Sequence, residues 1–294
     1  MHYQGPIIDA HHHLWALSPG SHPWLEAPDR VALAHTVLPD AYRQTFARFS
    51  ISASVYIEAL ASDPEAEIRQ AETWRQESNG RICSAIIGHA PLDAPDITSR
   101  LDRQMALSPA FRGVRDIAAA RPGTPGFARA PDLLARPAFL QGLKALAARK
   151  LVFELMVMPE QLEISAALLA EVPDLAVAIE HAGNPCDRSP AGMARWRAGM
   201  ARLAALPNAI VKVSALQVLD PDWTLESLRS VFDPIVTLFG PERMCIGTDF
   251  PVHDLTCPGP IALNAFLDLT AGWSASDQDS LFLSTARHFY RIPS

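Results

Sequence analysis

The chain begins with an apolar run that leads directly into three histidines, Ile7-Ile8-Asp9-Ala10-His11-His12-His13-Leu14-Trp15. In a strand, residues two apart point to the same face, so we expect His11 and His13 to project together and His12 to point away. Two histidines on one face of a strand are typical of part of a functional site. A surface turn or a tag remnant would also contain histidines, but apolar residues flank this run on both sides.

Seven further short, apolar runs have the pattern of buried strands. They are Ile51–Leu60, Arg81–Leu92, Phe111–Ile117, Leu151–Met158, Leu175–His181, Ala209–Leu216 and Met244–Thr248. Helical patterns alternate with them, one after Pro39 and others at Pro64–Asn79, Pro95–Leu107, Pro137–Arg149, Pro159–Val172, Met193–Leu206 and Leu225–Phe239, before a final Ala275–Arg287. This alternation predicts an α/β fold, a single (β/α)8 TIM barrel spanning residues 1–294. A doubly wound open sheet is disfavoured because no Gly-rich turn follows the first strand.

In such a barrel, polar residues at the carboxyl ends of the strands form the site. The candidates are His11, His13, Glu58, His89, Arg115, Asp116, Glu180, His181 and Asp249. Barrel closure places the last strand beside the first, so we expect Asp249 to lie next to His11 and His13. Two imidazoles and a carboxylate could hold a metal ion or position a water molecule. Alone, Asp249 would equally suit a turn before Pro251.

Five stretches in order carry a resemblance that covers nearly the whole chain. They are Ile8–Trp15, Phe111–Arg115, Glu180–Pro185, Pro207–Ser214 and Gly247–Val252. In these the chain resembles the amidohydrolase superfamily, in its amidohydrolase-related branch that contains sugar-lactone hydrolases such as fuconolactonases. The resemblance implies a TIM barrel of the metal-dependent-hydrolase type.

The resemblance also implies roles for individual residues. Asp249 would accept the proton of the attacking water and later donate it to the leaving oxygen, while His181, His11 and His13 would polarise or orient the carbonyl. Arg115 matches an arginine that holds a substrate carboxylate or hydroxyls. The chain departs from the family pattern at Glu180, Asn184 and Ala215, where Asp, Lys and Gly are more common.

A two-metal site is disfavoured, because no lysine ends the fourth strand and no histidine ends the fifth. One zinc or other divalent cation held by His11, His13 and Asp249 fits the pattern, with His181 or Glu58 as further ligands. Because a lactone is already electrophilic, a desolvated aspartate could also suffice without metal. We favour catalysis in which the metal is optional.

Three further residues are candidates for substrate binding. Glu58 could contact a substrate hydroxyl or cap a helix, and Trp24 could cover the substrate or anchor the long loop 16–38. His253 follows Asp249 closely enough to line the rim. By contrast, Glu154 and Lys212 stand inside apolar strands, which predicts a buried structural pair.

The net charge of −7 and the pI near 5.8 argue against nucleic acid or an acidic membrane surface as a partner and favour a small molecule. The four cysteines lack metal-type spacing and are expected to be buried free thiols of a reducing compartment. With neither a signal peptide nor a membrane span expected, we predict a cytoplasmic protein; a homo-oligomer stays open.

The sequence therefore predicts a hydrolase that opens a lactone of a sugar acid or small carboxylic acid at the carboxyl face of the barrel. A zinc-dependent decarboxylase or another hydrolase of the same superfamily is the first alternative. A catalytically silent barrel that binds a small ligand is the second.

Overall fold

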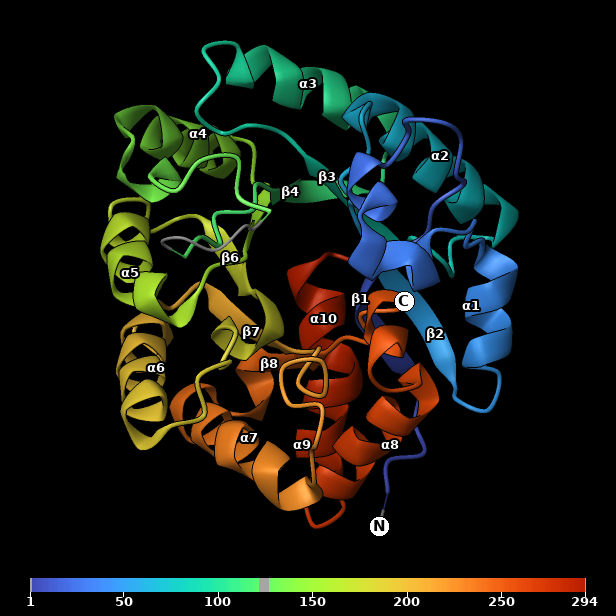
Figure 1. Ribbon diagram of the computed structural model, residues 1–294, viewed down its shortest axis with the longest axis vertical. Helices are drawn as coiled ribbons and strands as arrows, with labels where there is room; N and C mark the ends of the chain where they lie inside the picture. The colour runs from blue at the N-terminus through green and yellow to red at the C-terminus, as the bar shows by residue number, and fades with distance from the viewer. Residues whose placement is uncertain (1, 122–126, 294) are drawn as a thin grey trace.

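Eight parallel strands lie side by side in chain order, with helices around them, in a computed structural model that describes residues 2–121 and 127–293 (Figure 1). The strands are β1 (Ile7–His12), β2 (Ile51–Ile57), β3 (Ala85–His89), β4 (Phe111–Arg115), β5 (Val152–Leu155), β6 (Ala176–Ile179), β7 (Ala209–Val213) and β8 (Met244–Ile246). Each is centred within a run predicted from the sequence, although most are shorter. The (β/α)8 barrel is confirmed.

One main helix follows each strand. These helices are α1 (Pro39–Thr45), α2 (Pro64–Glu77), α3 (Ile97–Leu107), α4 (Pro137–Ala148), α5 (Leu162–Ala170), α6 (Pro190–Ala204), α7 (Leu225–Phe239) and α8 (Gly259–Leu269). Helix α8 has no counterpart among the predicted helices. The predicted final helix at Ala275–Arg287 is confirmed: α9 (Ala275–Asp279), a π-helical turn at Ser280–Ser284 and α10 (Thr285–Phe289) follow one another without a break.

Backbone hydrogen bonds close the barrel between β1 and the residues just after β8. The Asp249 N–H donates to the His11 carbonyl at 2.7 Å, and the His13 N–H donates to the Phe250 carbonyl at 2.7 Å. Gly247 is needed at this seam, because a Cβ added to it would lie only 2.5 Å from the Cβ of His11. The closure therefore fixes where the Asp249 side chain begins relative to both histidines.

Asp9 clamps the same seam from within β1. Its buried carboxylate accepts hydrogen bonds from the Thr248 N–H at 2.8 Å, the Thr248 hydroxyl at 2.6 Å and the Tyr42 hydroxyl at 2.8 Å. The His11 N–H adds a fourth at 3.1 Å. A buried carboxylate with four donors is well satisfied, so Asp9 positions the residues beside it.

The long connection after β1 folds back over the carboxyl end of the barrel, where its Trp24 lines the pocket. It forms two short 3₁₀ helices, Pro23–Glu26 and Pro28–Leu33, and buries Leu25 and Leu33 in the core. Trp15 and Val37 pair across its base, with backbone hydrogen bonds of 3.0 and 2.8 Å. This loop supplies one side of the pocket described below.

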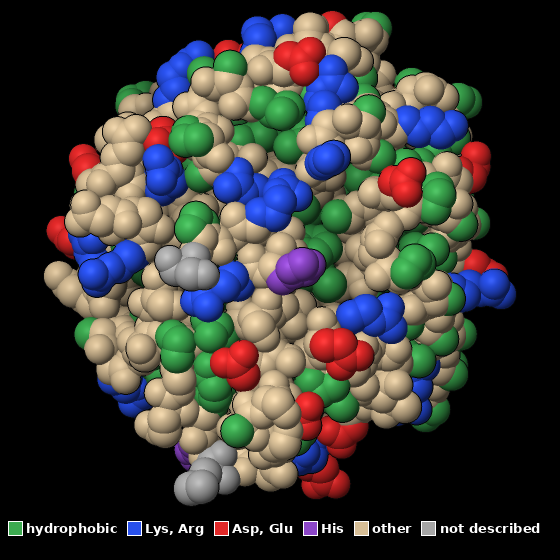
Figure 2. All heavy atoms as spheres, turned by 180° about the vertical axis from the view of Figure 1, so that it is seen from behind, with side chains coloured by type: hydrophobic (Ala, Val, Ile, Leu, Met, Phe, Trp, Pro, Cys, Tyr) green, Lys and Arg blue, Asp and Glu red, His purple; other side chains and the backbone are tan. Residues whose placement is uncertain are grey.

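The opposite end of the barrel carries a different surface. Several Lys and Arg side chains gather around the middle of this face (Figure 2). The cleft at the amino ends of the strands is lined by Arg75, Arg81, Arg112 and Arg287 among others. Over the described ranges, no helix combines the length and apolarity that crossing a membrane requires.

The cysteines are free thiols, as predicted. Cys83, Cys245 and Cys257 are buried, whereas Cys186 is only partly buried, which corrects the expectation that all four would be.

Candidate active site

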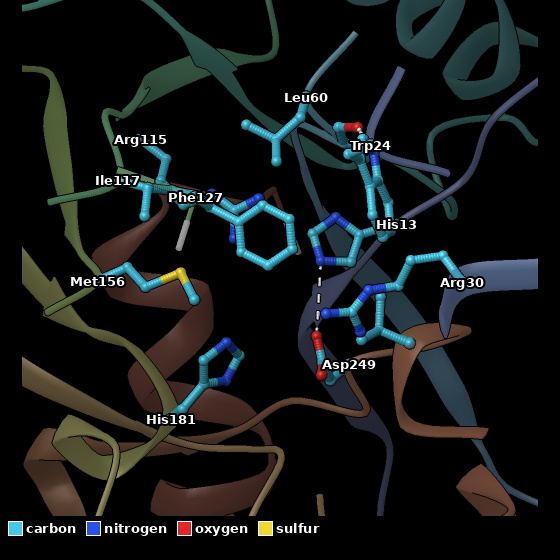
Figure 3. Close-up of a pocket in the computed structure, with 12 residues that line it drawn as sticks. His13, Trp24, Arg30, Leu60, Arg115, Ile117, Phe127, Met156, His181 and Asp249 are labelled. Carbon is cyan, nitrogen blue, oxygen red and sulfur yellow. Dashed lines mark hydrogen bonds and ion pairs between the residues drawn. The ribbon is translucent and has the colours of Figure 1, made fainter. Parts of the chain in front are cut away.

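A pocket with a cavity volume of about 90 Å³ opens at the carboxyl end of the barrel (Figure 3). Its lining residues are His13, Trp24, Arg30, Ala59, Leu60, Arg115, Ile117, Phe127, Met156, His181, Asp249 and Val252. Figure 3 shows His13, His181 and Asp249 on one side of the space, with Leu60, Ile117 and Met156 across from them.

Three ligand atoms converge at the floor of this pocket. The Nε2 atoms of His11 and His13 lie 3.2 Å apart, and Asp249 Oδ1 lies 3.4 Å from the first and 3.5 Å from the second. Two atoms bound tetrahedrally to one zinc ion, each at about 2.0–2.1 Å, are about 3.3–3.4 Å apart. The three residues therefore fit a single divalent cation, and the predicted placement of Asp249 beside the histidines is confirmed.

An acceptor oxygen on the far side of each ring leaves its Nε2 atom free to act as an electron-pair donor. The Nδ1 atom of His13 lies 2.8 Å from the Ile57 carbonyl oxygen, which can only accept, so Nδ1 carries the proton and Nε2 presents a lone pair. The Nδ1 atom of His11 faces Glu180 Oε1 at 3.6 Å, also an acceptor. Two lone pairs and a carboxylate oxygen then meet, an arrangement that a cation or an added proton stabilises.

Glu180 links this floor to its surroundings. Neither His11 Nδ1 nor Glu180 Oε1 has a hydrogen-bond partner within the described chain, and both are buried. A carboxylate behind a histidine orients the ring and raises the basicity of the ligand nitrogen. Glu180 with His11 and His181 also forms a second group that could hold a metal ion.

His181 approaches the floor from the short 3₁₀ turn after β6, Glu180–Gly183, where its backbone is left-handed at φ 51°. Its ring centroid lies 4.8 Å from that of His11, and its Nδ1 lies 2.9 Å from the Ser214 hydroxyl. The other sequence-predicted histidine, His12, points away from the site as expected. It packs on Tyr42 at 4.7 Å, and burial lowers its pKa to about 3.

Electrostatics at the floor favour an ionised acid beside neutral rings. Burial would raise the pKa of Asp249, but the neighbouring imidazoles of His13 and His181 outweigh burial, so this pKa lies below its usual value. Burial lowers the pKa of His11 well below its usual value, with Lys212 adding to the effect. Burial likewise lowers the pKa of His181. These lowered pKa values favour the neutral forms of His11 and His181 beside an ionised Asp249.

Arg115 lies beside the site but is committed to two acids. Its Nε donates to Glu58 Oε1 at 2.6 Å, its Nη2 to the Glu58 carbonyl at 2.6 Å and its Nη1 to Glu180 Oε2 at 3.3 Å. Glu58 is fully buried, and its other oxygen accepts the Leu60 N–H at 2.8 Å. A substrate-binding role for Arg115 or Glu58 stays a prediction. The contacts seen here hold Glu180 and the end of β2 in place.

The two remaining candidates for substrate binding, Trp24 and His253, differ in their position relative to the pocket. Trp24 lines the pocket, and its indole N–H donates to the Ala59 carbonyl at 2.7 Å. His253 is buried, with Nδ1 2.6 Å from the Cys257 carbonyl and Nε2 3.1 Å from Gln217 Oε1. Both of its ring nitrogens are engaged with protein, whereas Trp24 presents its ring to the pocket.

Several residues around the site were not predicted from the sequence. Asp9 stands in the same β1 motif as His11, and Ser214 ends the stretch Pro207–Ser214. Arg30 and Phe127 line the pocket from two long connections. For these two the sequence gives no periodic signal.

A family model described as amidohydrolase matches residues 8–292 of the chain. The chain is 30% identical over 302 residues to uncharacterized protein y4mH of Sinorhizobium fredii, covering 97% of this chain and 98% of that protein. It is 28% identical over 302 residues to an L-fucono-1,5-lactonase of Burkholderia multivorans, covering 97% and 96%.

Among solved structures, the fold resembles an amidohydrolase from Burkholderia multivorans that was crystallised with bound zinc. The TM-score is 0.86 and the sequence identity 25%, over 98% of this chain and 100% of that one.

Proposed function

The chain belongs to the amidohydrolase family, and from this premise we propose that it opens a lactone by directing water onto the ring carbonyl. One observation carries the proposal: an ionised carboxylate, Asp249, sits 3.4–3.5 Å from two imidazole nitrogens at the floor of a small pocket. The relatives named as L-fucono-1,5-lactonases support the choice of a lactone.

The reaction needs a base, an acid and a group that polarises the carbonyl. Asp249 takes one proton from water as the water oxygen bonds to the carbonyl carbon. The ring C–O bond then breaks, and Asp249 returns that proton to the leaving oxygen, which becomes a hydroxyl. The new carboxyl group ionises, so each turnover releases one proton.

His11, His13 and Asp249 would hold a metal ion, and a zinc or similar cation bound there would polarise the carbonyl and acidify water. His181, across the pocket floor, orients the carbonyl oxygen through Nε2, because its Nδ1 is held by Ser214. Glu180 keeps the His11 ring in place. A lactone is reactive enough for the carboxylate to act without the cation. Bound metal should therefore raise the rate of ring opening and not be essential for it.

The test is a panel of five- and six-membered lactones, with ring opening followed as acid release by a pH indicator. We expect turnover above the spontaneous rate for at least one lactone, with and without chelator and with added zinc. The absence of hydrolysis for every lactone under all three conditions would contradict the proposal. Release of carbon dioxide from aromatic acids, dependent on zinc, would instead support the decarboxylase alternative.

A further inference from the structure

The pocket has two unlike sides. The reacting groups His13, His181 and Asp249 form its floor, whereas seven of the other nine lining residues are apolar and the remaining two are Arg30 and Arg115. The apolar members are Trp24, Ala59, Leu60, Ile117, Phe127, Met156 and Val252. Among the described lining residues, no Ser, Thr, Asn or Gln stands opposite the floor. A substrate ring held with its carbonyl on the floor therefore presents its substituents to an apolar wall (Figure 3).

Most polar groups near this wall already have partners; the exception is Arg30, whose one ion pair among the described residues is to Asp29 at 3.4 Å. The Trp24 N–H donates to the Ala59 carbonyl, the Leu60 N–H donates to Glu58, and the Ala59 N–H donates to Glu67. Arg115 uses three donors on Glu58 and Glu180. A substrate hydroxyl that replaced its hydration water here would find few groups free to receive it.

The roof over the wall is a stack of flat groups from separate connections. Phe127, between β4 and α4, meets the Trp24 ring edge to face at 5.8 Å. The Arg30 guanidinium lies 5.6 Å from the centre of the same Phe127 ring, with its own ion pair only to Asp29 among the residues described. The aromatic rings present π surface toward the space, which suits a hydrocarbon group, while Arg30 adds a guanidinium to the lining.

Burying a hydroxyl without a hydrogen-bond partner is unfavourable, whereas burying a hydrocarbon chain against such a wall is favourable. An apolar pocket rejects a substrate that adds one hydroxyl by up to about 10²-fold. A polyhydroxylated sugar lactone places several hydroxyls on the same wall. The discrimination against it should therefore be at least of this order.

We propose that the substrate of this site is a lactone that carries a hydrocarbon side group where sugar lactones carry ring hydroxyls. The inference rests on the proposed function, because it takes the carbonyl to be on the Asp249 floor. It differs from the activity named for the L-fucono-1,5-lactonases, whose substrate is hydroxylated.

The test compares three six-membered lactones that share a ring: δ-decalactone with an alkyl chain, unsubstituted δ-valerolactone and D-glucono-1,5-lactone. After correction for spontaneous opening, we expect kcat/KM for δ-decalactone to exceed that for gluconolactone by about 10²-fold or more. Equal values, or a preference for gluconolactone, would overturn the inference and leave lactone hydrolysis standing.

A substitution on the wall should change this preference. Met156→Gln keeps the side-chain length and adds an amide, so we expect the ratio of decalactone to gluconolactone to fall by about tenfold. Met105→Gln is the matched control, because Met105 is 40% exposed on α3 and lies outside the pocket lining. If Met156→Gln does not fold, Leu60→Gln tests the same wall from a partly exposed position. An unchanged ratio in the folded wall variant would contradict the inference.

Binding separates the two claims if no lactone is hydrolysed. The lactams 6-pentylpiperidin-2-one and gluconolactam resist ring opening and carry the same substituents, and their binding can be measured by calorimetry. Tighter binding of the pentyl lactam with no lactone turnover would retain the preference of the pocket while refuting hydrolysis. Tighter binding of gluconolactam would refute the preference itself.

Discussion

Two buried groups of charged residues occupy the same barrel, and they differ in how completely they are paired. Glu154 of β5 accepts one hydrogen bond from the ammonium group of Lys212 on β7 at 2.8 Å and another from the Tyr290 hydroxyl at 2.6 Å. At the carboxyl end, His11, His13 and Asp249 approach one another at 3.2–3.5 Å with their lone pairs converging. The first group is satisfied within the protein. The second group lacks a cation or proton between its converging lone pairs. This difference in pairing separates a structural cluster from a reactive one.

The largest effect should come from the carboxylate of the unpaired group. Asp249→Asn keeps the size of the side chain but removes the base, so we expect turnover of the best lactone to fall by about 10³-fold or more. Far-ultraviolet circular dichroism and thermal unfolding should match the parent chain. Asp174→Asn, on an exposed residue, makes the same chemical change and should leave turnover intact. Comparable losses in both variants would remove Asp249 from the mechanism.

Metal binding should distinguish the floor histidine from an exposed one. His13→Asn removes one of three converging ligands, so zinc affinity measured by competition with a chromogenic chelator should fall by about 10²-fold. His35→Asn, on an exposed residue, should bind zinc like the parent chain. Undiminished affinity in the His13 variant would place the cation elsewhere.

Substitutions in the paired group, Lys212 and Glu154, should lower the stability of the protein and leave its turnover nearly unchanged. Lys212→Met leaves the buried Glu154 carboxylate without its cation, and we expect a loss of about 3–5 kcal/mol in the free energy of unfolding by urea. The double variant with Glu154→Gln should recover much of that loss. Turnover per folded molecule should change by less than about tenfold in both. A stable single variant with a large loss of turnover would show that this group belongs to the active site.

The smallest effect concerns a third buried acid, Glu67 of α2. Burial raises its pKa to about 8, although the Ala59 N–H and the Tyr56 hydroxyl donate to it. The folded state therefore holds its proton more tightly than the unfolded chain. This contribution to stability is present below about pH 4.5 and is lost as the pH rises toward 8.

Glu67→Gln should remove that pH dependence. The urea midpoint of unfolding should fall by more between pH 5.5 and pH 8 in the parent chain than in the variant. Glu77→Gln, on the exposed end of α2, is the control and should behave like the parent. Parallel pH profiles for all three proteins would show that the folded protein does not retain this proton.

The sequence predicts the strands well, because a barrel strand buried on both faces is a short apolar run that needs no partner to be recognised. It also predicts Lys212 with Glu154, since two opposite charges in such runs must meet. Helix α8 was missed because it follows an irregular segment and no strand comes after it. The start of α6 at Pro190 follows a Ser189 cap that the sequence does contain.

At the site, barrel closure alone was enough to place Asp249 beside His11 and His13. The pairing of Arg115 with Glu58 and Glu180 could not be predicted, because it depends on which rotamers the packed rim allows. Ala215 illustrates what a structure adds. This alanine adopts a left-handed backbone at φ 54°, a conformation that glycine adopts more easily.

The most direct test of the account is ring opening of the best lactone in ¹⁸O-labelled water, with the product fragmented in a mass spectrometer. Attack on the carbonyl directed by Asp249 predicts one labelled oxygen in the product carboxyl group and an unlabelled hydroxyl. Label in the hydroxyl would mean that water attacks the alkyl carbon and would contradict the account.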